Sequence, residues 1–367
     1  MRNAVKARLL ALVCLVATGV VLAQAASGRI TVPLFDHPVG KAFLFPEFTR
    51  PAFKVEYPGN VEATFDVTYA TVMGARPLLL DIYRVPNAGP RPAIIFVHGG
   101  SYVGGNPRED RHPIYGEGDG FMAYVASRGY VVIPVTYRLA DEAKWPAQLE
   151  DVKAAIRWVR ANAVQYGVDP QHIGVWGESA GGHIAAMVGS TCGISEFDKQ
   201  ENKGIFNNSN VMQSVQDKAA NQSSCVEAAV VWSGTTDFSQ LDAQKESFTK
   251  LVHNSPASSQ SRVLGCNLGT TCDTASVQRA SALYFVAQGG ADKTSFLFQA
   301  GTHDEATPWR QSQILYDALR AKGISARIDL VPGANHYFTG ATKDQAKEIL
   351  DTFFEFLDNT LGTPARK

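Results

Sequence analysis

The sequence HIGVWGESAGGHIAA, residues 172–186, places Ser179 between two glycines directly after a run of apolar residues. Small residues follow the serine, which is typical of the first turn of a helix that packs closely on a strand. A G-x-S-x-G pattern after a buried strand forces a sharp turn that lifts the serine hydroxyl above the edge of the sheet. Gly177 and Gly181 are needed because the two backbones approach too closely there for a Cβ atom. The stretch therefore predicts an exposed serine nucleophile at the N-terminus of a helix.

On both sides of this turn, short β-branched runs alternate with segments of helical periodicity. The pattern predicts a hairpin at 64–70 and 78–83, buried strands at 93–97, 130–135, 226–232, 295–299 and 326–330, a strand–turn–helix at 173–190, and helices at 121–128, 146–165 and 343–361. Such alternation predicts an α/β fold with a mostly parallel central sheet and helices on both faces. We expect two interrupting stretches, 193–224 and 237–285, to be insertions at the end of the sheet where loops build a site.

The first 25 residues are typical of an export signal. Residues 1–8 carry three basic side chains, residues 9–22 are mostly apolar, and Ala-Gln-Ala at 23–25 fits a signal peptidase site. We therefore expect a secreted or periplasmic protein. The rest of the chain divides into an N-terminal extension, 26–63, and an α/β domain, 64–361.

The charge of the chain excludes some partners. Removing residues 1–25 takes away three basic residues and no acidic one, so the formal net charge changes from −1 to −4. A mildly acidic chain without a basic run is not expected to bind nucleic acid or an anionic membrane. The sequence has no metal-binding or nucleotide-binding motif, so we expect no metal and no cofactor.

Four cysteines remain beyond the export signal: Cys192, Cys225, Cys266 and Cys272. In an exported protein they most simply form disulfides, and four cysteines allow three pairings. We expect local pairing, of Cys192 with Cys225 and of Cys266 with Cys272. A zinc site is the alternative, but the sequence lacks the C-x₂-C spacing and nearby histidines that such a site needs.

A serine hydroxyl needs a base and an orienting acid, which follow it in the chain in the order acid, then histidine. His336 lies after the last predicted strand and before the final helix, where a loop can bend back over the sheet. Asp304 directly follows a strand, whereas Asp292 precedes that strand and Glu305 should point away from its neighbour. We therefore predict Asp304 as the acid and His336 as the base.

Acyl transfer also needs hydrogen-bond donors for an oxyanion. The stretch FVHGGS, residues 96–101, leaves an early strand with two consecutive glycines. The amides of Gly99 and Gly100, with that of Ala180, can point at one oxygen if this loop folds over the serine. Such donors contribute roughly 3 kcal/mol each to transition-state stabilisation. His98 is expected to hold the loop rather than to transfer a proton.

Four motifs in the same order resemble the α/β-hydrolase esterases with an HGG oxyanion loop, namely FVHGGSY, DVKAAIRWVRANAVQYGVDPQHIGVWGESAGGHIAA, GTHDEATP and GANHYF. They are most similar to the branch of bifunctional feruloyl and acetyl-xylan esterases, near the hormone-sensitive-lipase-like enzymes. The resemblance spans about residues 64–358 and implies the α/β-hydrolase fold and the catalytic residues predicted above. The acid motif departs from the family, which commonly has a valine before the proline. Residues 26–63 and the cysteines have no counterpart in the family.

The expected function is a serine carboxylic-ester hydrolase that works through an acyl-enzyme on a small-molecule or polymer-attached ester. Feruloyl or acetyl esters of plant polysaccharide are substrates by analogy with the family. A polyester hydrolase, a peptidase or amidase on the same fold, and a non-catalytic binding protein are the alternatives. Tyr102 and Tyr337 are expected to contact substrate at the mouth of the site.

A lipase that acts on oil droplets needs a lid with a broad apolar face. The insertion at 193–224 is the expected position of such a lid, and its apolar residues are scattered among many polar ones. The sequence therefore predicts short-acyl or aromatic-acyl substrates, hydrolysed without interfacial activation.

Overall fold

The computed structural model describes residues 54–72, 74–108, 112, 114, 120–198, 219–249 and 251–362. The predicted export signal, residues 26–53 and residues 199–218 of the first insertion lie outside these ranges. No helix in the described ranges is long and apolar enough to cross a membrane.

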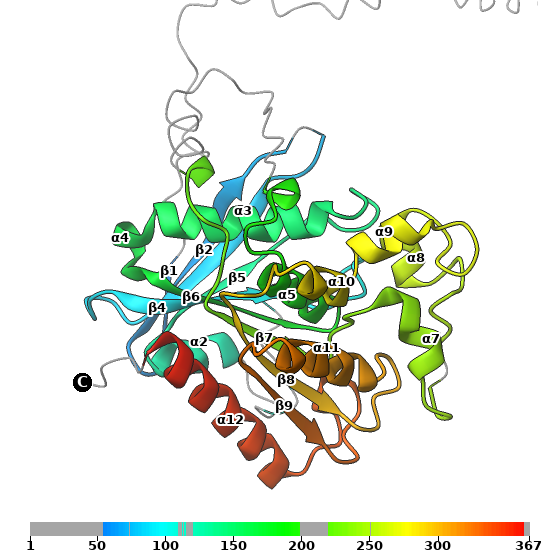
Figure 1. The fold of residues 1–367 in the computed structure, drawn as a ribbon. Helices are drawn as coiled ribbons and strands as arrows, with labels where there is room; N and C mark the ends of the chain where they lie inside the picture. Colours follow the sequence, from blue (N-terminus) through cyan, green and yellow to red (C-terminus); the bar gives the residue numbers. More distant parts are fainter. Residues whose placement is uncertain are drawn as a thin grey trace, which may run out of the picture. The chain divides into compact units, whose positions relative to one another are not determined.

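The described residues form one nine-stranded sheet in the order β1-β2-β3-β5-β4-β6-β7-β8-β9 (Figure 1). The strands are β1 Lys54–Tyr57, β2 Val61–Ala70, β3 Leu78–Arg84, β4 Arg91–Val97, β5 Val131–Val135, β6 Val168–Glu178, β7 Ala228–Trp232, β8 Ser295–Gly301 and β9 Ala326–Val331. Pairing is antiparallel from β1 to β5 and parallel from there to β9. The predicted hairpin and the mostly parallel sheet are confirmed.

Helices cover both faces of the sheet. They are α2 Phe121–Ser127, α3 Ala147–Ala161, α4 Ala163–Tyr166, α5 Ala180–Ser190, α7 Leu241–Gln244, α8 Ser259–Leu264, α9 Thr274–Arg279, α10 Ala282–Ala287, α11 Arg310–Ala321 and α12 Lys343–Leu361, with 3₁₀ turns at Ser195–Phe197, Phe238–Gln240 and His336–Phe338. Helices α3, α5, α10 and α11 share one buried cluster, and α2 and α12 share the other. Because both faces are covered, the central strands are continuous apolar runs.

Two boundaries differ from the prediction. The helix expected at 146–165 breaks at Asn162, whose side-chain amide donates to the Trp158 carbonyl (2.7 Å) and ends α3. The sheet also begins earlier than expected. The Pro-Gly-Asn turn after Tyr57 has Gly59 and Asn60 in left-handed conformations, and it folds β1 back onto β2. Residues 54–63, assigned above to an extension, are therefore part of the sheet.

The first insertion does not begin or end where we expected. Helix α5 starts at the carboxyl end of β6 and runs back for 11 residues, about 16 Å, so it ends near the amino ends of the strands. The chain then returns at Cys225, just before the amino end of β7, and Arg160 of α3 donates to the Cys225 carbonyl (3.0 Å). The described ends of the 193–224 insertion are therefore at the edge opposite Ser179, and the predicted lid position is wrong for them. The 237–285 insertion follows the carboxyl end of β7, as predicted.

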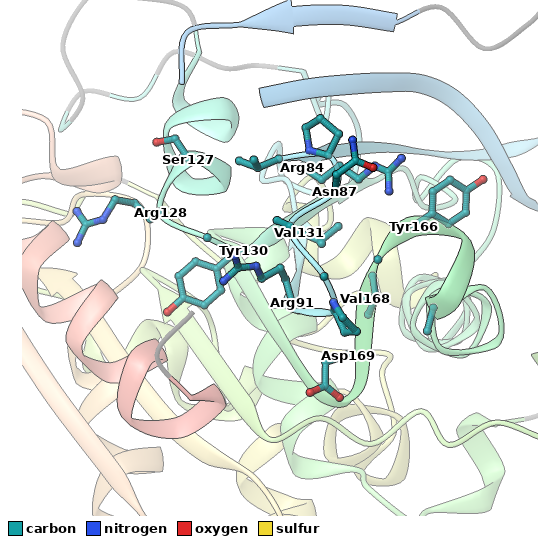
Figure 2. A pocket seen from close by; sticks show the side chains of 18 of the residues that line it. Arg84, Asn87, Arg91, Ser127, Arg128, Tyr130, Val131, Tyr166, Val168 and Asp169 are labelled. Carbon is teal, nitrogen blue, oxygen red and sulfur yellow. The ribbon is translucent and has the colours of Figure 1, made fainter. Parts of the chain in front are cut away.

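A cavity of about 1020 Å³ lies at this amino edge of the sheet (Figure 2). It is lined by the β3–β4 turn, the end of α2 and the α4–β6 turn, including Arg84, Arg91, Tyr166 and Asp169. Asp169 is paired with the nearby His172 (2.9 Å). We call this space the amino-end cavity.

Candidate active site

Ser179 occupies the sharp turn between β6 and α5. Its backbone has φ 54° and ψ −117°, and its N–H donates to the Trp232 carbonyl of the neighbouring strand (2.9 Å). A Cβ atom on Gly177 would overlap the Gly181 carbonyl, and one on Gly181 would overlap the Val97 carbonyl. Both glycines are therefore required by close backbone contact. A positive φ costs a serine about 1–3 kcal/mol, so the surrounding packing must hold this turn in place.

Asp304 and His336 meet across the carboxyl ends of β8 and β9. Asp304 is 1 % exposed, and its Oδ1 accepts from the N–H groups of Ala306 and Thr307, both at 2.8 Å. Its Oδ2 lies 2.8 Å from Nδ1 of His336. A carboxylate only accepts, so the proton of this contact belongs to Nδ1, and Nε2 is left for other contacts.

Ser179 and His336 line one cavity of about 240 Å³, which we call the serine cavity. Ala180, Tyr102 and Tyr337 also line it. No hydrogen bond joins the Ser179 hydroxyl to the His336 ring within the described residues. Catalytic hydrogen bonds are often loose until substrate is bound. The structure thus brings the predicted serine, acid and histidine to one end of the sheet.

The predicted oxyanion loop lies against the serine. A Cβ atom on Gly99 would be 3.3 Å from the Cβ of Ser179, and Gly100 has φ 106°, which favours glycine. Within the described residues, the N–H groups of Gly99, Gly100 and Ala180 donate to no protein acceptor. These amides are free to donate to a bound oxygen atom.

His98 is buried beneath this loop. Its Nδ1 contacts the Gly99 carbonyl (2.7 Å), its own carbonyl accepts from the Tyr137 hydroxyl (3.0 Å), and the two rings stack at 4.5 Å. Burial lowers the pKa of His98, which keeps the ring neutral at neutral pH. These contacts fit the predicted role in holding the loop.

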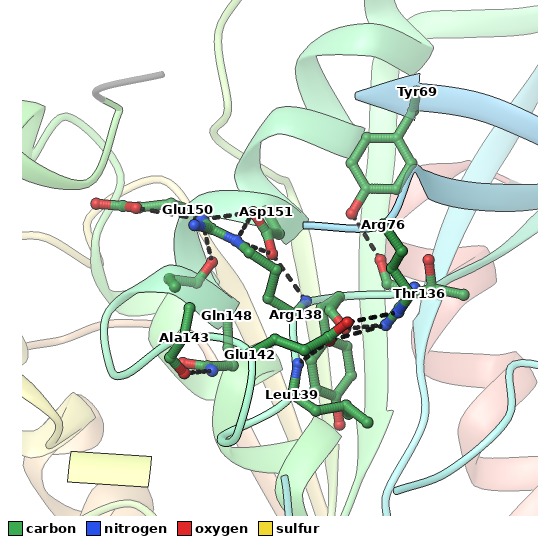
Figure 3. A network of polar contacts seen from close by, with 12 residues as sticks. Tyr69, Arg76, Thr136, Arg138, Leu139, Glu142, Ala143, Gln148, Glu150 and Asp151 are labelled. Atoms are coloured by element: carbon green, nitrogen blue, oxygen red, sulfur yellow. Dashed lines mark hydrogen bonds and ion pairs between the residues drawn. The ribbon is translucent and has the colours of Figure 1, made fainter. Parts of the chain in front are cut away.

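Arg138, the residue after Tyr137, forms an ion pair with Asp151 that the sequence did not reveal (Figure 3). The Arg138 guanidinium donates to both oxygens of Asp151 (2.8–3.0 Å), and the Arg138 N–H donates to the same carboxylate (2.8 Å). Arg76 donates to the Tyr137 carbonyl (2.8 Å). Burial raises the pKa of Asp151, and the hydrogen bonds from Arg138 oppose that rise. The network fixes the segment that stacks on His98.

Tyr102 and Tyr337 both line the serine cavity. Tyr102 is 2 % exposed, has φ 61° and packs edge-on against His183, with ring centroids 5.7 Å apart. Tyr337 has φ 56°, and its ring centroid lies 4.3 Å from that of His336. A Cβ atom on Gly99 would come within 2.6 Å of the Tyr337 hydroxyl.

Other residues of the site gave no signal in the sequence. The 237–285 insertion brings Leu251, Val252, His253 and residues 258–260 to the serine cavity. This stretch has no periodic pattern that could have placed it. His112 Nε2 lies 3.1 Å from Oε2 of the glutamate that precedes Ser179, a long-range contact without a local pattern.

The structure joins the cysteines in local pairs. Cys192 is bonded to Cys225 with Cα atoms 4.8 Å apart, and Cys266 to Cys272 with Cα atoms 5.0 Å apart. In the described part of the chain, no group of three or more His, Cys, Asp or Glu side chains is arranged to hold a metal ion.

Residues 80–319 match the BD-FAE family. The probable carboxylic ester hydrolase LipM of Mycobacterium tuberculosis is 28 % identical over 245 residues, which are 66 % of this chain and 48 % of LipM. Esterase LipQ of the same organism is 26 % identical over 303 residues, 82 % of this chain and 63 % of LipQ. The chain thus spans about half to three fifths of the length of these curated relatives.

A solved structure, the truncated form of a carbohydrate esterase from gut microbiota, is 26 % identical to this chain with a TM-score of 0.63. The alignment covers 82 % of this chain and 99 % of that one. This solved structure agrees with the described sheet, and the family match covers more than half of the sequence. The chain has the α/β-hydrolase fold and belongs to the BD-FAE family.

Proposed function

We propose that the protein is a serine carboxylic-ester hydrolase. The observation that carries the proposal is the serine cavity, in which a strained Ser179 and a His336 ring paired with Asp304 face the same small space. The uncommitted amides beside Ser179 supply the remaining component that acyl transfer requires. The relatives named above are esterases by their names, which supports the same reaction class.

The reaction follows from the role of each group. The Ser179 oxygen attacks the ester carbonyl while Nε2 of His336 takes its proton, and the carbonyl oxygen becomes an oxyanion held by backbone amides. His336 then protonates the leaving alcohol, which leaves an acyl-enzyme on Ser179. Water attacks the acyl group, again with His336 as the base, and releases the acid. Asp304 stabilises the imidazolium and keeps Nε2 directed at the reacting atoms.

The substrate class is proposed from the size of the serine cavity. Its volume is about 240 Å³, whereas a cavity of about 150 Å³ accepts benzene. The space therefore suits a short acyl chain or a single aromatic ring. Acetyl or feruloyl esters of plant polysaccharide meet this limit, and the similarity to a carbohydrate esterase supports a sugar-linked ester.

We also propose that the protein is exported to an oxidising compartment, outside the cell or in the periplasm. Two disulfides in one chain are typical of secreted and periplasmic proteins. Sequencing the N-terminus of the protein recovered outside the cytoplasm tests the predicted cleavage after residue 25.

The decisive experiment is Ser179→Ala. We expect kcat on nitrophenyl acetate to fall by at least about 10³, because only binding and the oxyanion donors remain. An organophosphate such as paraoxon should modify the wild type at Ser179, as located by mass spectrometry, and leave the variant unmodified. A variant with a near-normal rate would overturn the proposal.

A substrate panel tests the class of ester. Nitrophenyl acetate and butyrate should be hydrolysed more than about tenfold faster than the palmitate, since the part of a long chain that extends beyond the serine cavity gains little further burial. Rates on methyl ferulate and on acetylated xylan then show whether the enzyme prefers aromatic acyl esters or acetyl esters. A rate that rises once a long-chain substrate passes its solubility limit would contradict the absence of interfacial activation.

A further inference from the structure

Two exposed apolar side chains stand at the rim of the serine cavity. Leu251 is 51 % exposed and Val252 is 54 % exposed, and both line the cavity. Few large apolar side chains are so exposed in the part of the chain that the structure describes. An apolar group that extends from the cavity over these two side chains would remove apolar surface from water. We call this pair the apolar rim.

The residue after the apolar rim is firmly anchored. His253 is 3 % exposed, and both its N–H and its Nδ1 lie 2.9 Å from Oδ1 of Asp242. Its Nε2 lies 2.9 Å from the Ala306 carbonyl. A carboxylate and a carbonyl only accept, so the ring makes both hydrogen bonds when both of its nitrogens carry protons. The Asn254 N–H adds a fourth contact, to Oδ2 of Asp242 (2.9 Å).

These contacts connect the insertion to the loop of the proposed acid. The Ala306 carbonyl accepts from His253, while the Ala306 N–H donates to Oδ1 of Asp304 (2.8 Å). The apolar rim is therefore held at a fixed place relative to Asp304 and its partner His336. An exposed rim without such an anchor would move freely and contribute little selectivity.

Several other residues around the serine cavity are polar. Side-chain hydroxyls or amides come from Ser101, Ser258, Ser259 and Gln260. The entrance thus combines an apolar pair with groups that can contact a hydroxylated partner. An ester that joins an apolar group to a hydroxyl-rich one, such as a sugar, matches this combination.

We infer that Leu251 and Val252 bind the apolar group of the ester, a single ring or a chain of a few carbons, and that His253 is the positioning residue that holds them. The inference rests on the proposed ester hydrolysis and names the residues that select its substrate. The same apolar group can belong to the acyl or to the alcohol side, and two substrate series separate these sources.

The first test compares Leu251→Ser/Val252→Ser with Val164→Ser. Val164 is 98 % exposed and lies on α4 at the opposite edge, so it is a matched control for replacing an exposed apolar residue. One series varies the acyl group (nitrophenyl acetate, butyrate and benzoate), and the other varies the alcohol (methyl, butyl and benzyl acetate). We expect the rim variant to lose about tenfold in kcat/KM for the larger apolar group of one series, chiefly through KM, with acetate or methyl ester changed less than about twofold.

Unchanged selectivity in both series would overturn the inference, as would an equal change in the Val164→Ser control. Activity of the wild type that is lost in Ser179→Ala supports the proposed function whatever the rim variant does. A wild type that hydrolyses none of these esters overturns both.

The second test is His253→Gln, with circular dichroism to verify folding. Glutamine keeps one donor nitrogen but lacks the second ring nitrogen that bridges Asp242 and Ala306. We expect the ratio of kcat/KM for butyrate over acetate, or butyl over methyl, to fall in the same direction as in the rim variant. A loss of kcat that is equal for all esters would show that His253 supports only the acid loop, and would overturn its role in positioning the rim.

Discussion

The two ends of the central sheet differ in what their loops contain. At the carboxyl ends, the loops after β6 and β9 bring Ser179 and His336 to a cavity of about 240 Å³, with Asp304 behind the histidine. At the amino ends lies a cavity of about 1020 Å³, without a comparable set of groups. The smaller cavity therefore contains the proposed catalytic groups. In parallel sheets the direction of the strands is thus a better guide to a site than the size of a cavity.

Backbone strain follows the same division. At the amino-end cavity, the non-glycine residues with positive φ are Asn60 and Asn87, a residue type that adopts this conformation easily. At the other end, serine and aromatic residues adopt it, each at a cost of about 1–3 kcal/mol. These are Ser101, Tyr102, Ser179, Ser233, Tyr337 and Phe338. The loops at the serine cavity are therefore held in conformations that loops elsewhere avoid.

The largest effect should come from comparing two aspartates on either side of β8. Asp304 follows the strand and is buried, whereas Asp292 precedes it and is exposed. Asp304→Asn should lower kcat on nitrophenyl acetate by about 10³–10⁴, because His336 loses the partner that sets its tautomer. Asp292→Asn should leave kcat unchanged. Similar losses of kcat in the two variants would contradict the proposal that the catalytic groups lie at the carboxyl ends of the strands.

The disulfides offer a second comparison, in stability. Replacing Cys192 and Cys225 by serine should lower the free energy of unfolding by about 4 kcal/mol, and replacing Cys266 and Cys272 by about 2.5 kcal/mol, from the loop lengths. Urea titrations measure both. The disulfide between Cys192 and Cys225 lies at the amino edge of the sheet, so its loss should not change KM. The second lies in the insertion that lines the serine cavity, so its loss should raise KM. Mass mapping of non-reduced peptides tests the pairing itself.

A smaller effect is expected from pH. Burial lowers the pKa of His183 to about 4, whereas an unfolded histidine titrates near pH 6.5. Between these values the unfolded state binds more protons, so the free energy of unfolding falls as the pH is lowered. His183 should account for about 2 kcal/mol of the loss between pH 7 and pH 5. His183→Gln should flatten this part of the stability curve. An unchanged curve in His183→Gln would contradict this.

The smallest effect should come from filling the amino-end cavity. Ala88 lines it, in the turn between β3 and β4. Ala88→Trp should change kcat/KM by less than about twofold and stability by less than about 0.5 kcal/mol, as expected for a surface change away from special features. A large loss of ester hydrolysis would show that this cavity takes part in the reaction.

The parts of the molecule that the sequence predicts well are those with a local signature. Strands covered on both faces are apolar runs, and the turn at Ser179 needs glycines at fixed positions. The order of serine, acid and histidine then leaves Asp304 and His336 as the candidates, and the structure brings them within 2.8 Å.

The parts that the sequence did not predict depend on distant contacts. Arg138 and Asp151 meet through the geometry of a loop and a helix, and His253 is placed by an irregular insertion. The error over the described ends of the first insertion, residues 193–198 and 219–224, has another cause. An insertion that follows a helix begins near the amino ends of the strands, whereas an insertion that follows a strand begins at the carboxyl ends. The amino-acid composition of the two insertions does not show which kind each one is.

The aromatic core below the serine cavity gives the protein an intrinsic optical signal. Trp176 and Trp232 are at most 1 % exposed, with ring centroids 4.8 Å apart at 69°. The Trp232 carbonyl accepts from the Ser179 N–H, and its ring packs on Phe338 at 5.3 Å, two residues from His336. Their fluorescence should be emitted at short wavelength, as from a dry environment. A change in emission on acylation would report movement of the Ser179 and His336 loops without any added dye.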